Sequence, residues 1–274
     1  MKAERPCEVC GMFYPADPSE LRRNIGELLS SVMALPKITG TVRGIVGPHA
    51  GYKYSGFTAA HAYSLLKGAK YSSVVIVSPS HREYFDGISV FPGHSYVTPL
   101  GVVPVDEELR ERLLKQCSEV TASYAGHGPE HAIEVQLPFL QYVLGEFRFL
   151  PIVIGDQKRE NCFALGDALA EVLADENALI IASTDLSHYH PSSVANNLDA
   201  IVIDDVKKFD YEGLMNDLEF QKTEACGGGP TVAVMLALWR LGVRKIAVLH
   251  HCNSGDVTGD SSQVVGYLAA AAYE

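Results

Sequence analysis

The sequence has little positive charge and few cysteines for its length. Its 22 Lys and Arg residues are outnumbered by 33 Asp and Glu residues, and the formal net charge is -11. Because phosphate backbones are bound by clusters of Lys and Arg, this balance argues against a nucleic-acid partner. Six cysteines in 274 residues are too few for a disulfide scaffold. We therefore expect free thiols in a reducing compartment.

Long apolar runs are also missing. No segment reaches the roughly 18 consecutive apolar residues of a membrane-spanning helix, and residues 1–20 lack the apolar core of a signal peptide. We expect a cytoplasmic protein with no membrane partner. Cys7 and Cys10 form a C-x-x-C pair, but neither a second pair nor a thioredoxin-like pattern accompanies it, so no zinc or redox role is expected there.

What the chain does contain is an alternation of helical and strand-like segments. Hydrophobic residues make up 47% of the sequence, which is enough to fill a large core. Helical periodicity predicts helices at 17–35, 55–68, 106–117, 132–144, 160–174, 196–209 and 229–242. Apolar runs without polar alternation, typical of strands covered on both faces, lie at 42–46, 74–77, 150–154, 178–182 and 245–249.

Two further stretches, at 87–93 and 95–105, indicate strands of antiparallel character, and 264–273 indicates a last strand. No linker rich in Pro, Gly or Ser divides the chain, and no repeat has a fixed period. The pattern predicts an α/β fold: a single three-layer domain over residues 1–274, with a central, mostly parallel or mixed sheet flanked by helices.

Histidines follow four of the five apolar runs. Ligands of open α/β sheets bind beyond the carboxyl ends of strands, so these are the positions where a site is expected. Five of the 10 histidines of the chain stand there: His49, His81, His188, His250 and His251. Metal binding or proton transfer is the chemistry that such a group of imidazoles predicts.

A single histidine at a strand end is commonly a half-buried residue with both ring nitrogens hydrogen-bonded. The joint occurrence of His49 and His81, each after a proline-containing strand end, favours a shared site instead. Asp185 precedes His188 by three residues, so both can face one point if the turn between them is helical.

The remaining histidines are assigned less specific roles. His250 and His251 are adjacent, so at most one of them can face the site. We interpret His61 as a residue of a helix face, His94 as a loop residue and His190 as a surface residue.

Two other stretches carry candidate chemistry. In "GPEHAIEVQLPFL" the spacing of Glu130, His131 and Glu134 at a helix start would suit a carboxylate that orients an imidazole, or simply the acids favoured at an exposed helix start. In "EACGGGPTVAV" Cys226 precedes three glycines and a helix N-terminus. That setting predicts an exposed thiol of lowered pKa and an anion pocket of free backbone N–H groups.

With these residues in view, the sequence resembles the Memo family, also called AmmeMemoRadiSam system protein B in prokaryotes. The resemblance runs along nearly the whole chain, and its motifs together are specific. They are, in family order, "GMFYPAD", "GPHAGYKYSG", "SPSHREYFDGISV", "TPLG", "EHAIEVQLPFLQ", "PIVIGD", "STDLSHYHP" and "ACGGGPTVAVML". The family fold is similar to that of class III extradiol ring-cleaving dioxygenases, which are non-haem iron enzymes.

The resemblance implies a metal site at His49, His81 and Cys226. It matches Asp185 and His188 to the family's "S-[ST]-D-x-x-H" motif, and it makes Glu130 and His131 residues of the metal's surroundings or of the substrate side. Some members continue the cysteine motif with Gly-Arg-His-Pro, whereas this chain has "CGGGP". A basic group is therefore missing, and the anionic or phosphotyrosine ligands suggested for eukaryotic relatives do not transfer directly.

Three functions stay open. The first is a non-haem metal-dependent oxidoreductase, dioxygenase-like, in which Fe(II) or Cu is bound and His188, oriented by Asp185, serves as acid or base. The second is a module that binds a peptide or an anionic ligand in the same pocket without turnover. The third is a zinc hydrolase. The ligand is an unknown small molecule or peptide, and the name of the prokaryotic group hints at a functional link to a radical-SAM protein.

Overall fold

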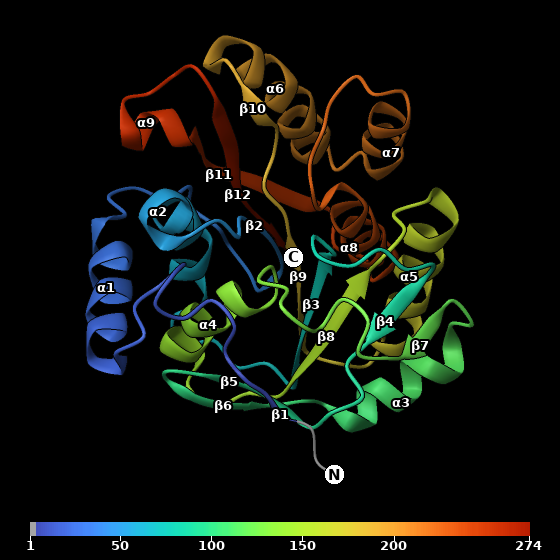
Figure 1. Ribbon diagram of the computed structural model, residues 1–274. Helices are drawn as coiled ribbons and strands as arrows, with labels where there is room; N and C mark the ends of the chain where they lie inside the picture. The colour runs from blue at the N-terminus through green and yellow to red at the C-terminus, as the bar shows by residue number, and fades with distance from the viewer. Residues whose placement is uncertain (1–3) are drawn as a thin grey trace.

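The four most apolar runs of the chain lie side by side at the centre of a large sheet (Figure 1). The computed structural model describes residues 4–274. Its central strands are β2 (Val42–Gly47), β9 (Ala178–Ser183), β3 (Ser73–Pro79) and β8 (Phe149–Ile154), and neighbours among them are parallel. Parallel strands need cover on both faces, which explains why these runs lack polar alternation.

Antiparallel strands extend the sheet on both sides. On one side, β12 (Val264–Tyr273) pairs with β2 and carries β11 (Lys245–Asn253) and β10 (His188–His190). On the other, β4 (Ile88–Val90) pairs antiparallel with β8, and β7 (Val120–Ala122) pairs parallel with β4. A separate small sheet contains β1 (Glu4–Arg5), β5 (Ser95–Thr98) and β6 (Gly101–Pro104). The predicted mixed α/β fold is confirmed.

Helices cover both faces of the large sheet (Figure 1). Alternate residues of each central strand belong to two different clusters of buried side chains, because successive side chains of a strand point to opposite faces. One cluster includes α1 (Pro18–Ser31), α2 (Tyr52–Tyr63) and α4 (Leu137–Leu144). The other includes α3 (Glu107–Gln116), α5 (Arg159–Val172), α6 (Ser192–Lys208), α7 (Tyr211–Glu219) and α8 (Gly228–Arg240).

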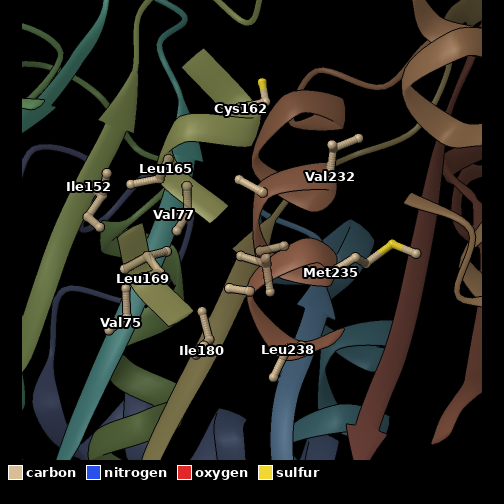
Figure 2. Packing of buried hydrophobic residues seen from close by; sticks show 14 of the residues in the cluster. Val75, Val77, Ile152, Cys162, Leu165, Leu169, Ile180, Val232, Met235 and Leu238 are labelled. Atoms are coloured by element: carbon tan, nitrogen blue, oxygen red, sulfur yellow. The ribbon is translucent and has the colours of Figure 1, made fainter. Parts of the chain in front are cut away.

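Figure 2 shows how the second cluster is packed. Leu165 and Leu169 of α5 lie over Val75 and Val77 of β3, and α8 runs beside α5 with Met235 turned toward the core. Burying an aliphatic side chain of this size stabilises a fold by about 1.5–3 kcal/mol. The packing holds α8, and with it the residue that precedes the helix, firmly against the sheet.

Some local predictions are wrong. The run at 245–249 lies in β11 at the sheet margin, where it pairs with β12 and its side chains are partly exposed, so it is not covered on both faces. The helix predicted from residue 132 begins with a 3-10 turn, Glu134–Gln136, so Glu130 and His131 lie in the loop before it. A 3-10 turn, Ser64–Leu66, also follows α2, and a short helix, α9 (Ser254–Thr258), precedes β12.

Cys7 and Cys10 differ from the prediction as well. They are joined in a disulfide, whereas the sequence predicted free thiols. Their Cα atoms lie 5.9 Å apart in a turn before α1, which is close enough for a disulfide. A single C-x-x-C pair in the sequence does not reveal this bond. Within residues 4–274 no helix has both the length and the apolar character to cross a membrane.

Candidate metal centre

The candidate site lies where the parallel strands end. His49 follows β2 by two residues, His81 follows β3 by two, and Asp185 follows β9 by two. Cys226 immediately precedes Gly227, the N-cap of α8. Because parallel strands end at one edge of the sheet, side chains distant in sequence meet there.

His49 is held by a fully buried serine. The imidazole is 1% exposed, and its Nδ1 lies 2.9 Å from Ser183 Oγ. Ser183 Oγ donates its only hydrogen to the carbonyl oxygen of Ala132 and accepts a hydrogen bond from Gln136 Nε2. The serine has no second hydrogen to give, so His49 Nδ1 must be the donor in its own bond. The lone pair of His49 is therefore on Nε2.

His81 is oriented by a carboxylate. Its Nδ1 lies 2.9 Å from Glu130 Oε1, and its backbone amide donates to Glu130 Oε2. The amides of His131 and Ala132 donate to the same carboxylate. Burial works in the opposite direction, but the hydrogen bonds from His81 prevail and lower the pKa of Glu130 to about 2. An ionised carboxylate only accepts, so His81 Nδ1 carries hydrogen and its Nε2 lone pair is free.

Cys226 completes the group. Its Sγ lies 3.2 Å from His49 Nε2 and accepts a hydrogen bond from the amide of Asp185. His49, His81 and Cys226 each offer one donor atom within 4.8 Å of the others. Ligand atoms bound to a transition metal at about 2.0–2.3 Å lie about 3–4 Å apart, so small shifts would bring all three to one ion.

The electrostatics of the group suit a cation. Burial, with the neighbouring His81 next, holds the pKa of His49 well below its ordinary value, so the imidazole is neutral. Burial and the Asp185 carboxylate raise the pKa of the Cys226 thiol, because a thiolate there would lack a compensating charge. The predicted lowering of this pKa is therefore wrong for the protein without metal. A divalent ion would supply the missing positive charge.

His131 adds a third imidazole. Its ring stacks on that of His81 with centroids 4.7 Å apart and meets the ring of His49 edge-on at 5.3 Å. Burial, with His49 next, lowers the pKa of His131 to about 4. His131 Nδ1 is buried and lies 3.3 Å from Glu130 Oε1, but it forms no hydrogen bond within residues 4–274. With Glu130 and His81 it forms a second group of possible metal donors.

Asp185 and His188 lie beside this group. Asp185 Oδ1 accepts a hydrogen bond of 2.8 Å from the amide of His49, and burial raises the pKa of its carboxyl. The amide of His188 donates to Glu224 Oε1, and its ring contacts that of Tyr189 at 5.7 Å. Tyr189 has φ 60, an uncommon conformation for a residue with a side chain, which turns the chain sharply after His188.

Two functional predictions from the sequence are wrong. The first is the anion pocket before α8, because the amides of Gly227 and Gly229 already donate to Thr184 Oγ1 and Gln157 Oε1. Glu134 does not orient an imidazole. It is fully buried and forms an ion pair with Arg5, 2.7 Å between Nη1 and Oε2.

The other histidines lie outside this group of donors. His250 Nδ1 bonds Thr58 Oγ1, and its ring stacks on His61 at 4.3 Å. His251 is exposed on β11. His190 pairs with Glu224, and His94 pairs with Glu107.

Several supporting residues were not singled out from the sequence. Ser183, Thr184 and Gln136 lie within quoted motifs, but no role was assigned to them, because serines, threonines and glutamines are common near strand and helix ends. Their role is visible only in the fold, where the ends of β2, β3 and β9 meet the loop that carries Glu130 and His131. One signal was available for Ser183: it ends a fully buried strand, where a hydroxyl requires partners.

The chain matches known proteins over nearly its whole length. The family model described as "Memo-like protein" matches residues 5–271. A MEMO1 family protein of Methanopyrus kandleri is 39% identical, with 97% of this chain and 98% of the relative covered. One of Methanosarcina mazei is 40% identical, with 98% of each covered.

A solved structure shares the fold. The crystal structure of an uncharacterized protein from Escherichia coli K12 superimposes with a TM-score of 0.56 at 16% identity, covering 83% of this chain and 99% of that one. At this identity the likeness concerns the fold alone. Taken with the match over residues 5–271 and the relatives at 39–40% identity, the findings show that this chain belongs to the Memo family.

Proposed function

We propose that the protein is a metal-dependent oxidoreductase whose metal is held by His49 Nε2, His81 Nε2 and Cys226 Sγ. One observation carries the proposal: Ser183 and Glu130 each take up the Nδ1 hydrogen of one imidazole, which leaves both Nε2 lone pairs free beside the thiol. A bound Fe(II) or Cu ion with three protein ligands would keep open positions and supply redox chemistry toward O₂ and a chelating substrate. The thiolate favours Cu, or Zn, over the iron of the dioxygenases.

The residues around the donors have distinct tasks in this proposal. The side chains of His81 and His131 are 25% and 14% exposed, whereas His49 is covered, so a substrate would enter from the side of His81 and His131. His131 is neutral above about pH 4 and can accept a proton from the substrate. His188 would serve as a second acid or base, with Asp185 close to both it and His49.

The proposal extends to partners and location. The open side of the site suits a small molecule or the end of a peptide, and the missing basic group makes an uncharged or chelating ligand the better match. We place the activity in the cytoplasm, and a radical-SAM protein is the partner enzyme that the family name suggests.

The first test is metal content. We expect the protein purified without added metal to contain Fe or Cu by elemental analysis, and the variant His49→Ala with His81→Ala to lose it while its circular dichroism stays unchanged. His94→Ala with His190→Ala is the matched control, because both residues lie in exposed ion pairs. Unchanged metal content in the first variant would show that the ligand set is wrong.

The second test is turnover. Oxygen uptake with catechols by the metal-loaded protein would support the oxidoreductase. A tightly bound metal without turnover, together with peptide binding, would instead support a binding module. Bound Zn with ester hydrolysis and no oxygen uptake would support a zinc hydrolase, which uses a similar donor set.

A further inference from the structure

A second chemically distinctive feature lies at the N-terminal end of the described chain. Cys7 and Cys10 form a disulfide in the turn between β1 and α1, and both residues are half-buried. The groups of possible metal donors found within the described part of the chain include neither sulfur. We propose that this disulfide is a thiol–disulfide exchange site for a small thiol, separate from the metal centre.

The disulfide lines a pocket. A cavity of about 430 Å³ opens beside the two cysteines, a volume within the range of small-molecule sites. Its other walls are provided by Glu4, Pro6, Ala16, Val97, Thr98 and Pro99. The walls are largely apolar with two polar side chains, and they leave room for a thiol to approach the sulfur atoms. Exchange requires such access, because the attacking thiolate must reach a sulfur directly.

The short spacing argues against a purely structural role. A disulfide stabilises a fold chiefly by closing a loop of the unfolded chain, and this effect grows with loop length. Here the bond spans a sequence separation of 3, so little chain entropy is removed. C-x-x-C is also the spacing of pairs that exchange readily, and a disulfide in a reducing compartment is usually transient.

The turn does not depend on the disulfide for its shape. The amides of Glu8 and Val9, which stand between the two cysteines, donate to the carboxylate of Glu134 at 2.9–3.1 Å. Tyr14 Oη donates to the same carboxylate at 2.6 Å, and Arg5 pairs with it. These contacts persist when the bond between the sulfur atoms opens, so reduction can occur in the folded protein.

The exchange is balanced with two equivalents of the small thiol. The first thiolate attacks one cysteine sulfur, which breaks the disulfide, forms a mixed disulfide and releases the other cysteine as a thiolate that takes up a proton. The second thiolate attacks the small-molecule sulfur of the mixed disulfide and releases the remaining cysteine. Two electrons pass to the protein, and the small thiol leaves as its own disulfide.

The test uses the folded full chain and dithiothreitol, followed by alkylation and peptide mass mapping. As isolated, Cys7 and Cys10 should resist alkylation; after dithiothreitol both should be labelled while circular dichroism stays unchanged. Cys117 and Cys162 are buried free cysteines and serve as internal controls that stay unlabelled. In glutathione buffers of varied redox ratio, we expect the pair to pass reversibly between the two states.

Two results would overturn the proposal. If the pair reacts only after denaturant is added, the disulfide is structural. If both cysteines are alkylated in the protein as isolated under air, no disulfide forms. Cys7→Ser adds an independent check, because the single Cys10 thiol left in the pocket should form a mixed disulfide with oxidised glutathione, whereas Cys117 should not.

Discussion

At the scale of single residues, the contact between Ser183 and His49 determines which ring nitrogen faces Cys226. Ser183→Ala removes the acceptor of the Nδ1 hydrogen and leaves the imidazole free to adopt the other tautomer. Loss of a partner that orients a metal ligand typically lowers metal affinity about 10- to 100-fold. We expect a decrease of that size for Cu or Zn, measured by competition with a chelator of known affinity.

A matched control is available on the neighbouring strand. Ser78 is also fully buried near the end of a central strand, but its hydroxyl donates to the carbonyl oxygen of Pro79 and to no other group of residues 4–274. Ser78→Ala should therefore leave the metal affinity unchanged. Equal losses in the two variants would mean that burial of a serine, and not the tautomer of His49, controls binding.

The residues of the site were predictable to different degrees. His49 and His81 could be proposed because each follows an apolar run, and the carboxyl ends of parallel strands converge. Cys226 was noticed because it precedes three glycines and a helix start, but its role as a metal ligand came from the family resemblance. Ser183 and Gln136 could not be found, because their role is a hydrogen-bond chain between segments that are 47 residues apart in the sequence.

At the scale of elements, the start of α8 depends on a glycine. A Cβ on Gly227 would lie 2.2 Å from the carbonyl oxygen of Ser183, so the helix start or the end of β9 must move. We expect Gly227→Ala to destabilise the protein by about 1–3 kcal/mol, as overpacking does, and to weaken metal binding by displacing Cys226. Thermal unfolding and metal titration would measure both effects.

Gly128 is the control for that change. A Cβ there would meet nothing within 4 Å, so Gly128→Ala should leave the unfolding temperature nearly unchanged. If Gly227→Ala were equally harmless, the close approach of α8 to β9 would not be needed for stability.

The last turn of α6 contains a buried carboxyl that should make stability depend on pH. Burial, followed by Asp217, raises the pKa of Asp205 from 3.8 to about 6, and among the described residues its Oδ2 has no hydrogen-bond partner. A carboxyl whose pKa is higher in the folded state binds protons more tightly there. Stability is therefore lost as pH rises from about 4 to 6, and the loss is complete above pH 6.

Asp205→Asn should remove this dependence. We expect the variant to be more stable than the wild type by about 1 kcal/mol at pH 7, with allowance for solvent screening, and equally stable near pH 4. Urea denaturation at both pH values measures the difference. Asp204→Asn changes an exposed partner of Lys208 and removes only a minor contribution to the raised pKa of Asp205, so it should show a much smaller contrast between the two pH values.

Element prediction succeeded where burial gives a clear pattern. The four central strands are mostly apolar because helices cover both their faces. Asp17 and Asp106 mark helix starts by accepting hydrogen bonds from first-turn amides. The prediction that β11 is covered on both faces was wrong because a strand covered by helices and a strand at the sheet margin can both have an apolar sequence. Only the antiparallel pairing with β12 separates them.

At the scale of the whole molecule, one ion pair ties the N-terminal segment to the loop that carries Glu130 and His131. Arg5 is 4% exposed, and it donates to the carbonyl oxygens of His127 and Gly128 as well as to Glu134 and the carbonyl oxygen of Glu130. This pair could not be predicted from the sequence, because its members are 129 residues apart. Long-range pairing of this kind has no periodic signature.

Removing one partner of that ion pair should lower the free energy of unfolding more than removing both partners. Arg5→Met leaves the Glu134 carboxylate buried without its cation, and such a loss costs about 3–5 kcal/mol. In Arg5→Met with Glu134→Gln no buried charge is left, so we expect a smaller loss than in the single variant. Urea denaturation of the four proteins of this double-mutant cycle gives the coupling energy.

Arg23→Met is the control, because the Arg23–Glu27 pair is exposed and should contribute little. If the losses in the free energy of unfolding of the two single variants summed to the loss of the double variant, the N-terminal segment would be held by its backbone contacts and not by the charge of Arg5.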